Sequence, residues 1–565
     1  MRMNGSEMVC EALRAEGVEV VFGYPGGAIM NVYDAIYKQN HFRHILARHE
    51  QAAVHAADGY ARASGKVGVA IVTSGPGFTN AVTGIATAFT DSIPLVIISG
   101  QVPITLIGTD AFQEIDAVGI SRPCTKHNYL VKSIEELPHI LQEAFYVAAS
   151  GRPGPVHIDI PKDVTAAFGE FYRKENFSMQ TYKPTVKGSP RQIQKVIEAI
   201  KESKKPLIYI GGGAILSNSA DEIRELVKVT GIPAVETLMA RGVLRYDDPL
   251  LISMLGMHGS YAANMAMSEA DIIISLGARF DDRVTGKLSE FAKNAKVVHV
   301  DIDPSSIAKL VNTDFPVVGD LKGVATEMLA QAKEKITPSD YAEWRELIGR
   351  FNELHPLNSS YQEDGNTLKP QSIIKKIGEL VPENTIISTD VGQHQMWTAQ
   401  FYPFSYPRQW ITSGGLGTMG YGFPAALGAK AACPEKIVVN ITGDGSILMN
   451  IQELMTAVES ELPVINVILN NNFLGMVRQW QTFFYDKRFS STDLTMQPDF
   501  VKLIEAFGGK GYRVDTYEGF ETAFKDAMNQ KTVCMIDVSV DRLENVLPMV
   551  PAGGTLYNMM LSYND

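Results

Sequence analysis

The stretch that decides the fold is residues 436–473, KIVVNITGDGSILMNIQELMTAVESELPVINVILNNNF. A β-branched run, 437–441, stops at Gly443-Asp444-Gly445, and a second apolar run, 464–469, stops at three asparagines. Between the two runs, apolar residues recur at helical spacing, at Ile447, Ile451, Leu454, Met455 and Val458. The pattern predicts a strand, a tight turn, a helix and a second strand.

The two strand ends of this unit carry a candidate metal site. Strands joined through a helix nearly always pair in parallel, so Asp444 and Asn471, 27 residues apart, are predicted to be neighbours at one sheet edge. Gly443 and Gly445 allow a ligand to approach the backbone, and a helix that starts near Ser446 offers N–H groups to an anion. One carboxylate, one amide oxygen and backbone carbonyls suit Mg2+ bound to a diphosphate. A tight turn and an ordinary asparagine loop are the alternative.

Composition narrows the class of protein. The chain has 565 residues, of which 45% are hydrophobic, so several buried cores are expected. A net charge of −12 argues against nucleic acid and against anionic membranes as partners. Four scattered cysteines favour a reducing compartment. We see neither a secretory segment nor an apolar stretch long enough to cross a bilayer, so we expect a cytoplasmic protein.

Helix and strand patterns alternate along most of the chain, which predicts an α/β fold with three doubly wound parallel-sheet domains. We place an N-terminal domain at residues 1–167, a central domain at 190–335, a C-terminal domain at 369–540 and a tail at 541–565. We interpret residues 168–191 as a linker. A second linker contains Pro338, His355-Pro356 and the polar run NSSYQEDGN.

Residues 68–100, GVAIVTSGPGFTNAVTGIATAFTDSIPLVIISG, have the layout of the opening stretch. The interval from Gly75 to Pro94 is 19 residues, against 20 from Gly443 to Pro463, and Pro76 replaces the acidic residue. The first domain thus resembles a copy of the third, which would suit a cofactor held between them. Chance similarity between two βαβ units is the alternative.

Glu50 is the candidate acid. It begins the alanine-rich segment EQAAVHAADGYARASG, whose small residues predict close packing and a largely buried carboxyl. Burial without a cation favours the protonated form, which suits proton transfer. A surface glutamate in the first turn of a helix is the alternative, and the local sequence alone favours it.

The spacing of GDGS and NN, together with RHEQ followed by A..AA.GYAR, resembles the thiamine diphosphate enzymes. The resemblance implies that Glu50 binds the aminopyrimidine and starts the reaction, and that the cofactor serves as electron sink when a 2-oxo acid loses carbon dioxide. It also implies a metal site at Asp444, Asn471 and the carbonyl of Phe473. The implied cofactor contacts are Gly26, Gly27, Val391, Gly392, Gln393, His394, Met419, Gly443, Gly445 and Ser446. By themselves, Met419 could be a core residue and the glycines turn formers.

Segments along the whole chain, above all NNNFLGMVRQWQ, resemble the catalytic subunits of acetohydroxyacid (acetolactate) synthases. The implied activity is that of a transferase that decarboxylates pyruvate and condenses the product with pyruvate or 2-oxobutyrate. Phe112, Gln113 and Lys162 would line the approach to the cofactor, Met476 and Trp480 would shape the acceptor pocket, and Arg283 would bind the acceptor carboxylate. A solvated Arg283 and a packing Trp480 are the alternatives.

The resemblance implies FAD contacts in the central domain and one, Arg152, in the N-terminal domain. Those of the central domain are Gly211, Gly212, Gly213, Thr237, Leu238, Met239, Leu255, Gly256, Met257, His258, Gly277, Arg279, Asp301 and Asp320. The strand that runs into Gly211-Gly212-Gly213 suits a pyrophosphate, although no complete GxGxxG follows. Arg241 stands where relatives have a glycine-rich segment, which makes the contacts of 237–239 the least secure. In this family FAD takes no part in net redox chemistry.

Two other functions remain open. One is a 2-oxo acid decarboxylase or a flavin-dependent pyruvate oxidase, and the other is a silent binding protein that keeps the metal site. The resemblance implies a homodimer or tetramer in which two chains build two equivalent sites, and a separate small regulatory subunit.

Overall fold

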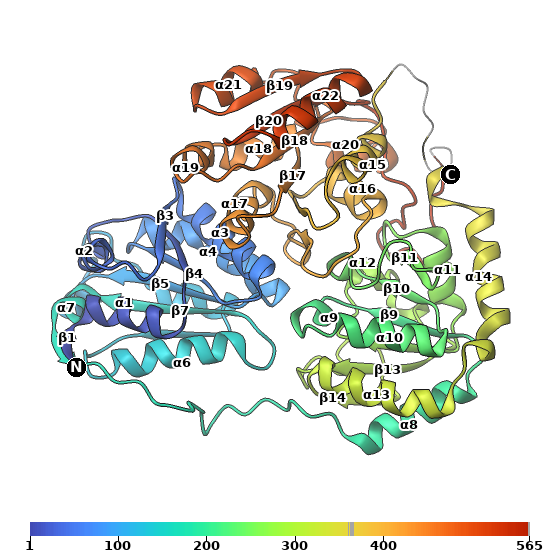
Figure 1. The fold of residues 1–565 in the computed structure, drawn as a ribbon, viewed down its shortest axis with the longest axis horizontal. Helices are drawn as coiled ribbons and strands as arrows, with labels where there is room; N and C mark the ends of the chain where they lie inside the picture. The colour runs from blue at the N-terminus through green and yellow to red at the C-terminus, as the bar shows by residue number, and fades with distance from the viewer. Residues whose placement is uncertain (360, 362–366, 563–565) are drawn as a thin grey trace. The chain divides into compact units, whose positions relative to one another are not determined.

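Three six-stranded sheets form the framework of the protein, as the computed structural model shows (Figure 1). The structure describes residues 1–359, 361 and 367–562. Most of the polar run NSSYQEDGN, which the sequence places in a linker, therefore lies outside the described residues. The α/β class with parallel-sheet domains is confirmed.

The first sheet has the strand order β3-β2-β4-β5-β7-β6, and its paired strands run parallel. Its strands are β2 (Val20–Gly23), β3 (Arg43–Leu46), β4 (Gly68–Val72), β5 (Leu95–Gln101), β6 (His127–Leu130) and β7 (Pro155–Pro161). The helices α1 (Gly5–Ala15), α2 (Met30–Lys38) and α6 (Leu137–Ala149) share one buried apolar cluster with these strands. The other face carries α3 (Glu50–Ser64) and α4 (Pro76–Asp91).

The last sheet repeats this topology with the order β16-β15-β17-β18-β20-β19. Its strands are β15 (Ile386–Thr389), β16 (Trp410–Ile411), β17 (Val438–Gly443), β18 (Ile465–Asn470), β19 (Lys510–Val514) and β20 (Cys534–Ser539). In both sheets the strands follow the same order when they are numbered along the chain, which supports the likeness noted between the two domains. The predicted parallel pairing of the two strands in 436–473 is confirmed.

The helix predicted inside 436–473 is broken into α18 (Asp444–Ile447), a 3₁₀ turn η7 (Leu448–Asn450) and α19 (Glu453–Glu459). The backbone keeps helical dihedral angles through Ile451 and Gln452, so the apolar period holds while the hydrogen bonds change. The Asn450 side chain donates to the carbonyl of Gly420 at 2.7 Å, so the 3₁₀ turn contacts a loop outside the unit. A 3₁₀ stretch within a helical path is a frequent mark of a functional region.

The central sheet has the order β11-β10-β9-β12-β13-β14, which is the Rossmann-type order. Its strands are β9 (Pro206–Ile210), β10 (Ala234–Glu236), β11 (Leu251–Met254), β12 (Ile272–Leu276), β13 (Lys296–Asp301) and β14 (Phe315–Val318). They pack with α8 (Pro190–Glu202), α10 (Ala220–Thr230), α11 (Tyr261–Glu269) and α13 (Leu321–Lys335) in one apolar core. The chain crosses from one side of the sheet to the other between β9 and β12, where doubly wound folds bind ligands.

Both expected linkers contain regular structure. Strand β8 (Phe168–Glu170) pairs antiparallel with β1 (Arg2–Asn4). Helix α14 (Ala342–Leu354) follows Pro338, and Trp344 and Ile348 are buried in the central core. The residues Trp344, Leu347, Ile348 and Phe351 recur at helical spacing, so the sequence does carry a helix signal that the linker interpretation missed.

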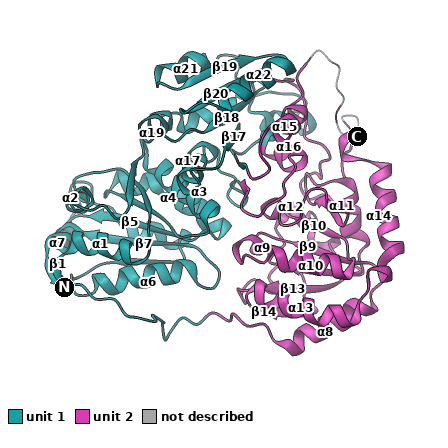
Figure 2. Ribbon diagram, in the orientation of Figure 1, with its two compact units in different colours: residues 1–183, 385–394, 411–539 teal, residues 184–384, 395–410, 540–565 magenta. Residues whose placement is uncertain are grey.

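The chain forms two compact units (Figure 2). Unit 1 comprises residues 1–183, 385–394 and 411–539 and contains the first sheet and most of the last. Unit 2 comprises residues 184–384, 395–410 and 540–565 and contains the central sheet. The domain boundaries 1–167, 190–335 and 369–540 stay a proposal.

Candidate functional site

The predicted metal-binding residues lie at the carboxyl end of the last sheet. Gly443, the last residue of β17, pairs with Leu469 of β18, so the register brings Asp444 next to the asparagines that end β18. Asn471 Oδ1 accepts from the N–H of Phe473 at 3.1 Å, and Asn471 Nδ2 donates to Gln393 Oε1 at 3.2 Å. The edge therefore joins residues from three predicted motifs.

Asp444 is a buried carboxyl group that has no cationic partner among the described residues. Its residue is 1% exposed, and burial raises the pKa of this carboxyl to about 7. The Gln497 side-chain amide donates to Asp444 Oδ2, while Gln497 Oε1 has no hydrogen-bond partner among the described residues. A divalent cation would favour the charged carboxylate and could use such oxygens, so the donor set fits Mg2+.

The loop after β15 brings the predicted diphosphate contacts to the same edge. Ser446 Oγ donates to the carbonyl of Val391 at 3.4 Å, and a Cβ on Gly443 would lie 3.0 Å from His394 Nδ1. His394 is buried, and burial lowers the pKa of its imidazole to about 3, so the ring is neutral. Gly443 thus lies where a larger residue would displace the neighbouring ring.

Asp390 accepts hydrogen bonds from two neighbouring elements at this edge. Its Oδ2 accepts from Thr442 Oγ1 at 2.6 Å, and its Oδ1 accepts from the N–H of Gly422 at 2.8 Å. Burial raises the pKa of Asp390, while both hydrogen bonds favour its charged form. Asp390 therefore ties the ends of β15 and β17 to the start of α17 (Gly422–Ala432).

Glu50 lies at the carboxyl edge of the first sheet, as the first residue of α3. It is 9% exposed, in agreement with the prediction of burial. Asn80 Nδ2 donates to Glu50 Oε2 at 3.0 Å, and Oε1 faces Gly77, where a Cβ would lie 3.3 Å away. One oxygen is thus oriented by α4 while the other adjoins a residue that has no side chain.

Small residues explain how α3 comes to bury Glu50. A Cβ on Gly59 would lie 2.0 Å from the carbonyl oxygen of Ala425, and one on Gly428 would lie 1.8 Å from that of Ala56. Helices α3 and α17 therefore cross with their backbones in contact. The same edge carries Gly26, where a Cβ would lie 2.5 Å from Thr73, and the exposed Gly27.

The three predicted residues of the cofactor approach follow two other strands of the first sheet. Phe112 is 88% exposed and Gln113 has a φ of 60°, both in the loop after β5. A Cβ on Gly75 would lie 2.8 Å from the carbonyl oxygen of Gln113, so this loop abuts the start of α4. Lys162 is exposed and begins α7 (Lys162–Ala166), directly after β7.

Met476 and Trp480 lie four residues apart on α20 (Gly475–Phe484) and share one face of it. Both are partly exposed, and the Trp480 ring lies 5.4 Å from the ring of Phe484. Arg478 and Gln479 are buried, and Gln479 Oε1 accepts from Gln393 Nε2 at 2.8 Å. The helix is thus anchored beside the diphosphate loop and presents apolar side chains outward.

The predicted FAD contacts of the central domain gather at the carboxyl edge of its sheet. A Cβ on Gly211 would lie 2.3 Å from the carbonyl oxygen of Gly277, and one on Gly213 would lie 2.8 Å from the Gly277 Cα. The ends of β9 and β12 are therefore packed backbone to backbone. Thr237 Oγ1 is buried and has no hydrogen-bond partner among the described residues. This glycine-lined crevice and the available hydroxyl fit a dinucleotide.

The other predicted FAD residues of unit 2 end neighbouring strands. The N–H of Met257 donates to the carbonyl of Arg283 at 2.7 Å, and His258 Nδ1 lies 3.3 Å from the carbonyl of Pro548. Arg279 pairs with Asp281 at 2.9 Å. The remaining contacts are Leu238 and Met239 after β10, Leu255 and Gly256 after β11, Gly212 after β9, Asp301 at the end of β13, and Asp320 at the N-cap of α13.

Arg241, the departure from the family pattern, points into the protein. Its guanidinium bonds to Glu236 Oε2 at 2.8 Å and lies over the ring of Phe404, and both charged residues are buried. Its charge is therefore matched inside unit 2, beside the 237–239 segment.

Arg283 and Arg152 belong to different units. The side chain of Arg283 is 61% exposed on α12 (Asp282–Thr285), so its guanidinium can bind an anion. Arg152 Nε donates to Ser92 Oγ at 2.8 Å in unit 1.

Sequence patterns do not mark Asn80 or Gln497 as site residues. Asn80 lies in the segment 68–100 quoted above, but its contact with Glu50 arises from the packing of α3 against α4. Gln497 lies 53 residues from Asp444 in an irregular loop, and no local pattern marks it.

In the part of the chain that the structure describes, no three His, Cys, Asp or Glu side chains group as a metal site. The predicted Mg2+ ligands, Asp444, Asn471 and the carbonyl of Phe473, include only one carboxylate, so this finding is compatible with them. None of the described helices is long and apolar enough to cross a membrane.

Comparison with known families places three matches along the chain. Residues 3–120 match the N-terminal TPP binding domain of thiamine pyrophosphate enzymes, residues 193–329 the central domain, and residues 390–538 the C-terminal TPP binding domain. Glu50 and Asp444 lie inside the two TPP binding domains.

Similar proteins extend over the full chain. The chain is 48% identical to the acetolactate synthase large subunit of Haemophilus influenzae, over 99% of this chain and 98% of that protein. It is 48% identical to the acetolactate synthase isozyme 3 large subunit of Escherichia coli, over 100% and 99%. A probable acetolactate synthase large subunit of Methanocaldococcus jannaschii is also 48% identical, over 99% and 95%.

Proposed function

We infer the function from one premise: the chain belongs to the acetolactate synthase large-subunit family of thiamine pyrophosphate (thiamine diphosphate) enzymes. The protein is a transferase that decarboxylates pyruvate and joins the remaining two-carbon unit to a second 2-oxo acid. Pyruvate as acceptor yields 2-acetolactate, and 2-oxobutyrate yields 2-aceto-2-hydroxybutyrate. The reaction is the first common step of branched-chain amino acid biosynthesis.

One observation carries this assignment within the structure. A buried carboxyl group, Asp444, adjoins Asn471 at a glycine-rich sheet edge inside the C-terminal TPP binding match. We propose that Asp444, Asn471 and the carbonyl of Phe473 hold Mg2+, which in turn holds the diphosphate.

Thiamine diphosphate, when bound, supplies a nucleophilic ring carbon and the electron sink for loss of carbon dioxide. The protein binds and orients the cofactor and the substrates, and it excludes water from them. Asn80 fixes Glu50 Oε2, so Oε1 is left to exchange a proton with the cofactor.

Substrate recognition falls to residues at three sheet edges. Lys162 and Gln113 supply polar groups at the first edge, and Phe112 supplies an apolar one. Arg283 binds the carboxylate of the acceptor through its two-pronged guanidinium. Met476 and Trp480 form an apolar wall whose width decides whether one extra methylene is accepted.

We also propose FAD in the central domain, supported by the crevice at Gly211, Gly213 and Gly277 and by the hydroxyl of Thr237. The positive charge of Arg241 does not argue against FAD binding, because Glu236 pairs with it. The flavin has no net redox role in the proposed reaction. The proposed FAD binding would be tested by asking whether yellow flavin stays with the protein through purification and gel filtration.

We propose a homodimer or tetramer in the cytoplasm. The relatives are named large subunits, which supports a separate small regulatory subunit for this chain. The four cysteines, which form no disulfide in the structure, suit a reducing compartment.

A product assay tests the function. The purified protein is incubated with pyruvate, thiamine diphosphate, Mg2+ and FAD, and the products are separated and quantified. We expect one acetolactate per two pyruvates consumed. Acetaldehyde as the sole product, or oxygen uptake equal to pyruvate consumption, would contradict the assignment and favour a decarboxylase or an oxidase.

A further inference from the structure

The loop that carries Met419 runs from Thr412 to Gly420 and is built from weakly constrained residues. Its sequence, TSGGLGTMG, has four glycines, of which Gly417 and Gly420 take positive φ values of 72° and 85°. Gly415, Leu416 and Gly417 are exposed. Glycine loses more conformational freedom on ordering than other residues, so this loop needs contacts from outside to hold one conformation.

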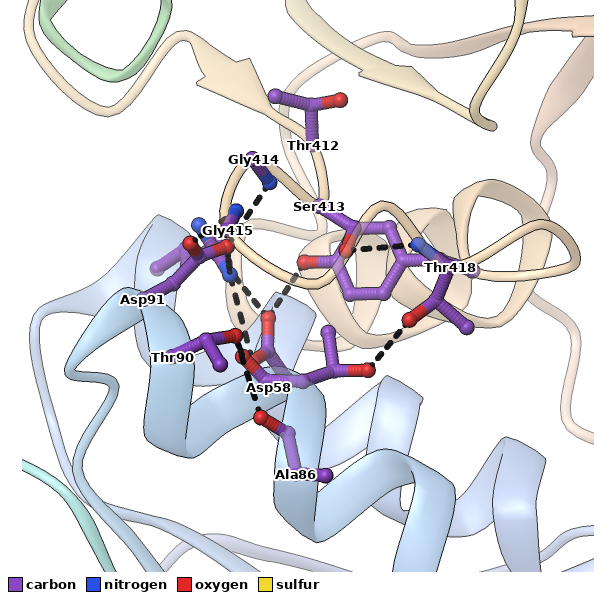
Figure 3. A network of polar contacts seen from close by, with 12 residues as sticks. Asp58, Ala86, Thr90, Asp91, Thr412, Ser413, Gly414, Gly415 and Thr418 are labelled. Atoms are coloured by element: carbon purple, nitrogen blue, oxygen red, sulfur yellow. Dashed lines mark hydrogen bonds and ion pairs between the residues drawn. The ribbon is translucent and has the colours of Figure 1, made fainter. Parts of the chain in front are cut away.

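The last turn of α4 supplies those contacts (Figure 3). Asp91 Oδ2 accepts from the N–H of Gly414 at 3.0 Å, and Asp91 Oδ1 accepts from the N–H of Gly415 at 2.7 Å. One turn earlier, the hydroxyls of Thr87 and Thr418 lie 2.8 Å apart. Thr87 Oγ1 also donates to the carbonyl of Thr83 at 2.9 Å, so Thr418 is the donor to Thr87. These bonds reach both ends of the loop.

Helix preferences do not explain Asp91. A carboxylate at the carboxyl end of a helix opposes the helix dipole, and this side chain is only 2% exposed. The charge is instead balanced by Arg62 of α3, which bonds to Asp91 Oδ2 at 2.8 Å and to Asp58 Oδ1 at 2.6 Å. Tyr421, directly after the loop, donates to Asp58.

The loop's own domain also contacts it, and the hydroxyls of Thr389 and Thr412 lie 2.8 Å apart. The N–H of Thr418 donates to Ser413 Oγ at 3.0 Å, and the Asn450 side chain donates to the carbonyl of Gly420. None of these bonds restrains Gly414 or Gly415. The carboxylate of Asp91 therefore restrains Gly414 and Gly415, because it accepts from two successive N–H groups and is itself paired with a buried guanidinium.

We propose that Asp91 is a positioning residue for the cofactor: through Gly414 and Gly415, with Thr87 acting through Thr418, it sets the position of Met419. This inference rests on the proposed function and on the thiamine diphosphate contact that the family resemblance implies for Met419. Asp91 itself touches neither the cofactor nor the substrate in this account.

Hydrogen exchange of the cofactor-free protein tests the first half of the proposal. In Asp91→Asn we expect amide exchange in residues 412–420 to be faster by about tenfold or more, because the charged acceptor is lost. Exchange in 438–443 and 465–470 should stay at the wild-type rate. Thr87→Val, which keeps the side-chain shape, should accelerate exchange near Thr418 and guards against failure of the first variant to fold.

Equilibrium dialysis of thiamine diphosphate with Mg2+ tests the second half. We expect the dissociation constant to rise by about tenfold in Asp91→Asn, as for the loss of one or two charge-assisted hydrogen bonds. The control is Glu459→Gln, which removes an ion pair of 2.6 Å with Arg48 in the same unit but does not contact the loop. This control should match the wild type in both experiments.

Unchanged exchange in 412–420, or acceleration spread equally over β17 and β18, would overturn the proposal in favour of a purely structural role. An unchanged dissociation constant would also overturn it. The exchange experiment uses neither substrate nor cofactor, so it is independent of the proposed function. A protein that showed faster exchange in 412–420 but formed no acetolactate would contradict the proposed function, while the restraint of the loop by Asp91 would still be supported.

Discussion

At the scale of single residues, Glu50 shows what the sequence could and could not establish. The small residues of α3 indicate a buried Glu50 because they permit close helix packing, but the local sequence alone favours a surface glutamate. The hydrogen bond of Glu50 with Asn80 could not be predicted, because that contact depends on how α3 and α4 pack in three dimensions. The contact of Gln497 with Asp444, 53 residues away, likewise depends on a tertiary contact that no local pattern encodes.

Glu50→Gln should lower turnover by about 100-fold or more, because the amide cannot supply the proton of a carboxyl group. Steady-state kinetics with pyruvate would check this. Asn80→Ala is the companion variant, and it should reduce turnover less because it loosens the carboxyl without removing it. Wild-type turnover in Glu50→Gln would revive the silent binding protein as an alternative.

Asp159 gives a pH dependence of stability. Burial raises the pKa of this carboxyl to about 7, although Ser99 and Gln101 donate to it. The unfolded chain has a pKa near about 3.9, so the folded state binds the proton more tightly. The resulting stabilisation is complete below about pH 4 and is lost as the pH rises towards 7.

Asp159→Asn should therefore lose less stability than the wild type between pH 4 and 7. The difference in unfolding free energy should be on the order of 1–4 kcal/mol. Asp444 and Glu453 also have pKa values raised to about 7 by burial, so the wild type minus variant difference is the quantity to measure by denaturant unfolding. Parallel curves for the two proteins would contradict the account.

At the scale of elements, the sequence located the strands of the 436–473 unit well because β-branched runs end at glycine and asparagine. It did not reveal the break in the helix after Asp444, since the apolar period survives a 3₁₀ turn. It also missed α14, although Trp344, Ile348 and Phe351 recur at helical spacing between Pro338 and Pro356.

The crossing of α3 and α17 predicts a large effect of a single methyl group. In Gly428→Ala, the new Cβ would lie 1.8 Å from the carbonyl oxygen of Ala56, so the helices must separate. We expect a loss of about 2 kcal/mol or more in unfolding free energy. Gly349→Ala is the matched control, because it lies in α14 with nothing within 4 Å and should be neutral or slightly stabilising. Similar thermal midpoints for the two variants would show that the crossing is not tight.

Helix α20 should control the choice of acceptor. Trp480→Ala removes the indole from the apolar wall and so enlarges the proposed acceptor pocket. The preference between 2-oxobutyrate and pyruvate should therefore change by about tenfold or more. Product ratios from a competition between the two acceptors would measure it. Val477→Ala, an exposed position on the same helix, serves as control and should keep the wild-type ratio. An unchanged ratio in Trp480→Ala would remove this residue from the acceptor pocket.

At the scale of the whole molecule, the two outer sheets share one strand order, and each presents loops at its carboxyl edge. One edge carries Glu50 and the other carries Asp444. The fold class and the function could be read from the sequence because the motifs sit at strand ends. The assembly could not, because a chain's own sequence does not state which copy supplies each edge.

A homodimer whose two chains both contribute to each site should lose activity on dilution below its dissociation constant. We expect specific activity to fall together with the dimer fraction, as measured by analytical ultracentrifugation at decreasing concentration. A fully active monomer would contradict shared sites.

The most direct test of the account is a crystal structure with thiamine diphosphate and Mn2+, in which the metal is located by its anomalous signal. The account predicts the metal peak within about 2.3 Å of oxygens of Asp444, Asn471 and Phe473, with a Glu50 carboxyl hydrogen-bonded to the pyrimidine of the same cofactor. A metal bound elsewhere, or a Glu50 that faces a cavity unconnected to the cofactor, would contradict it.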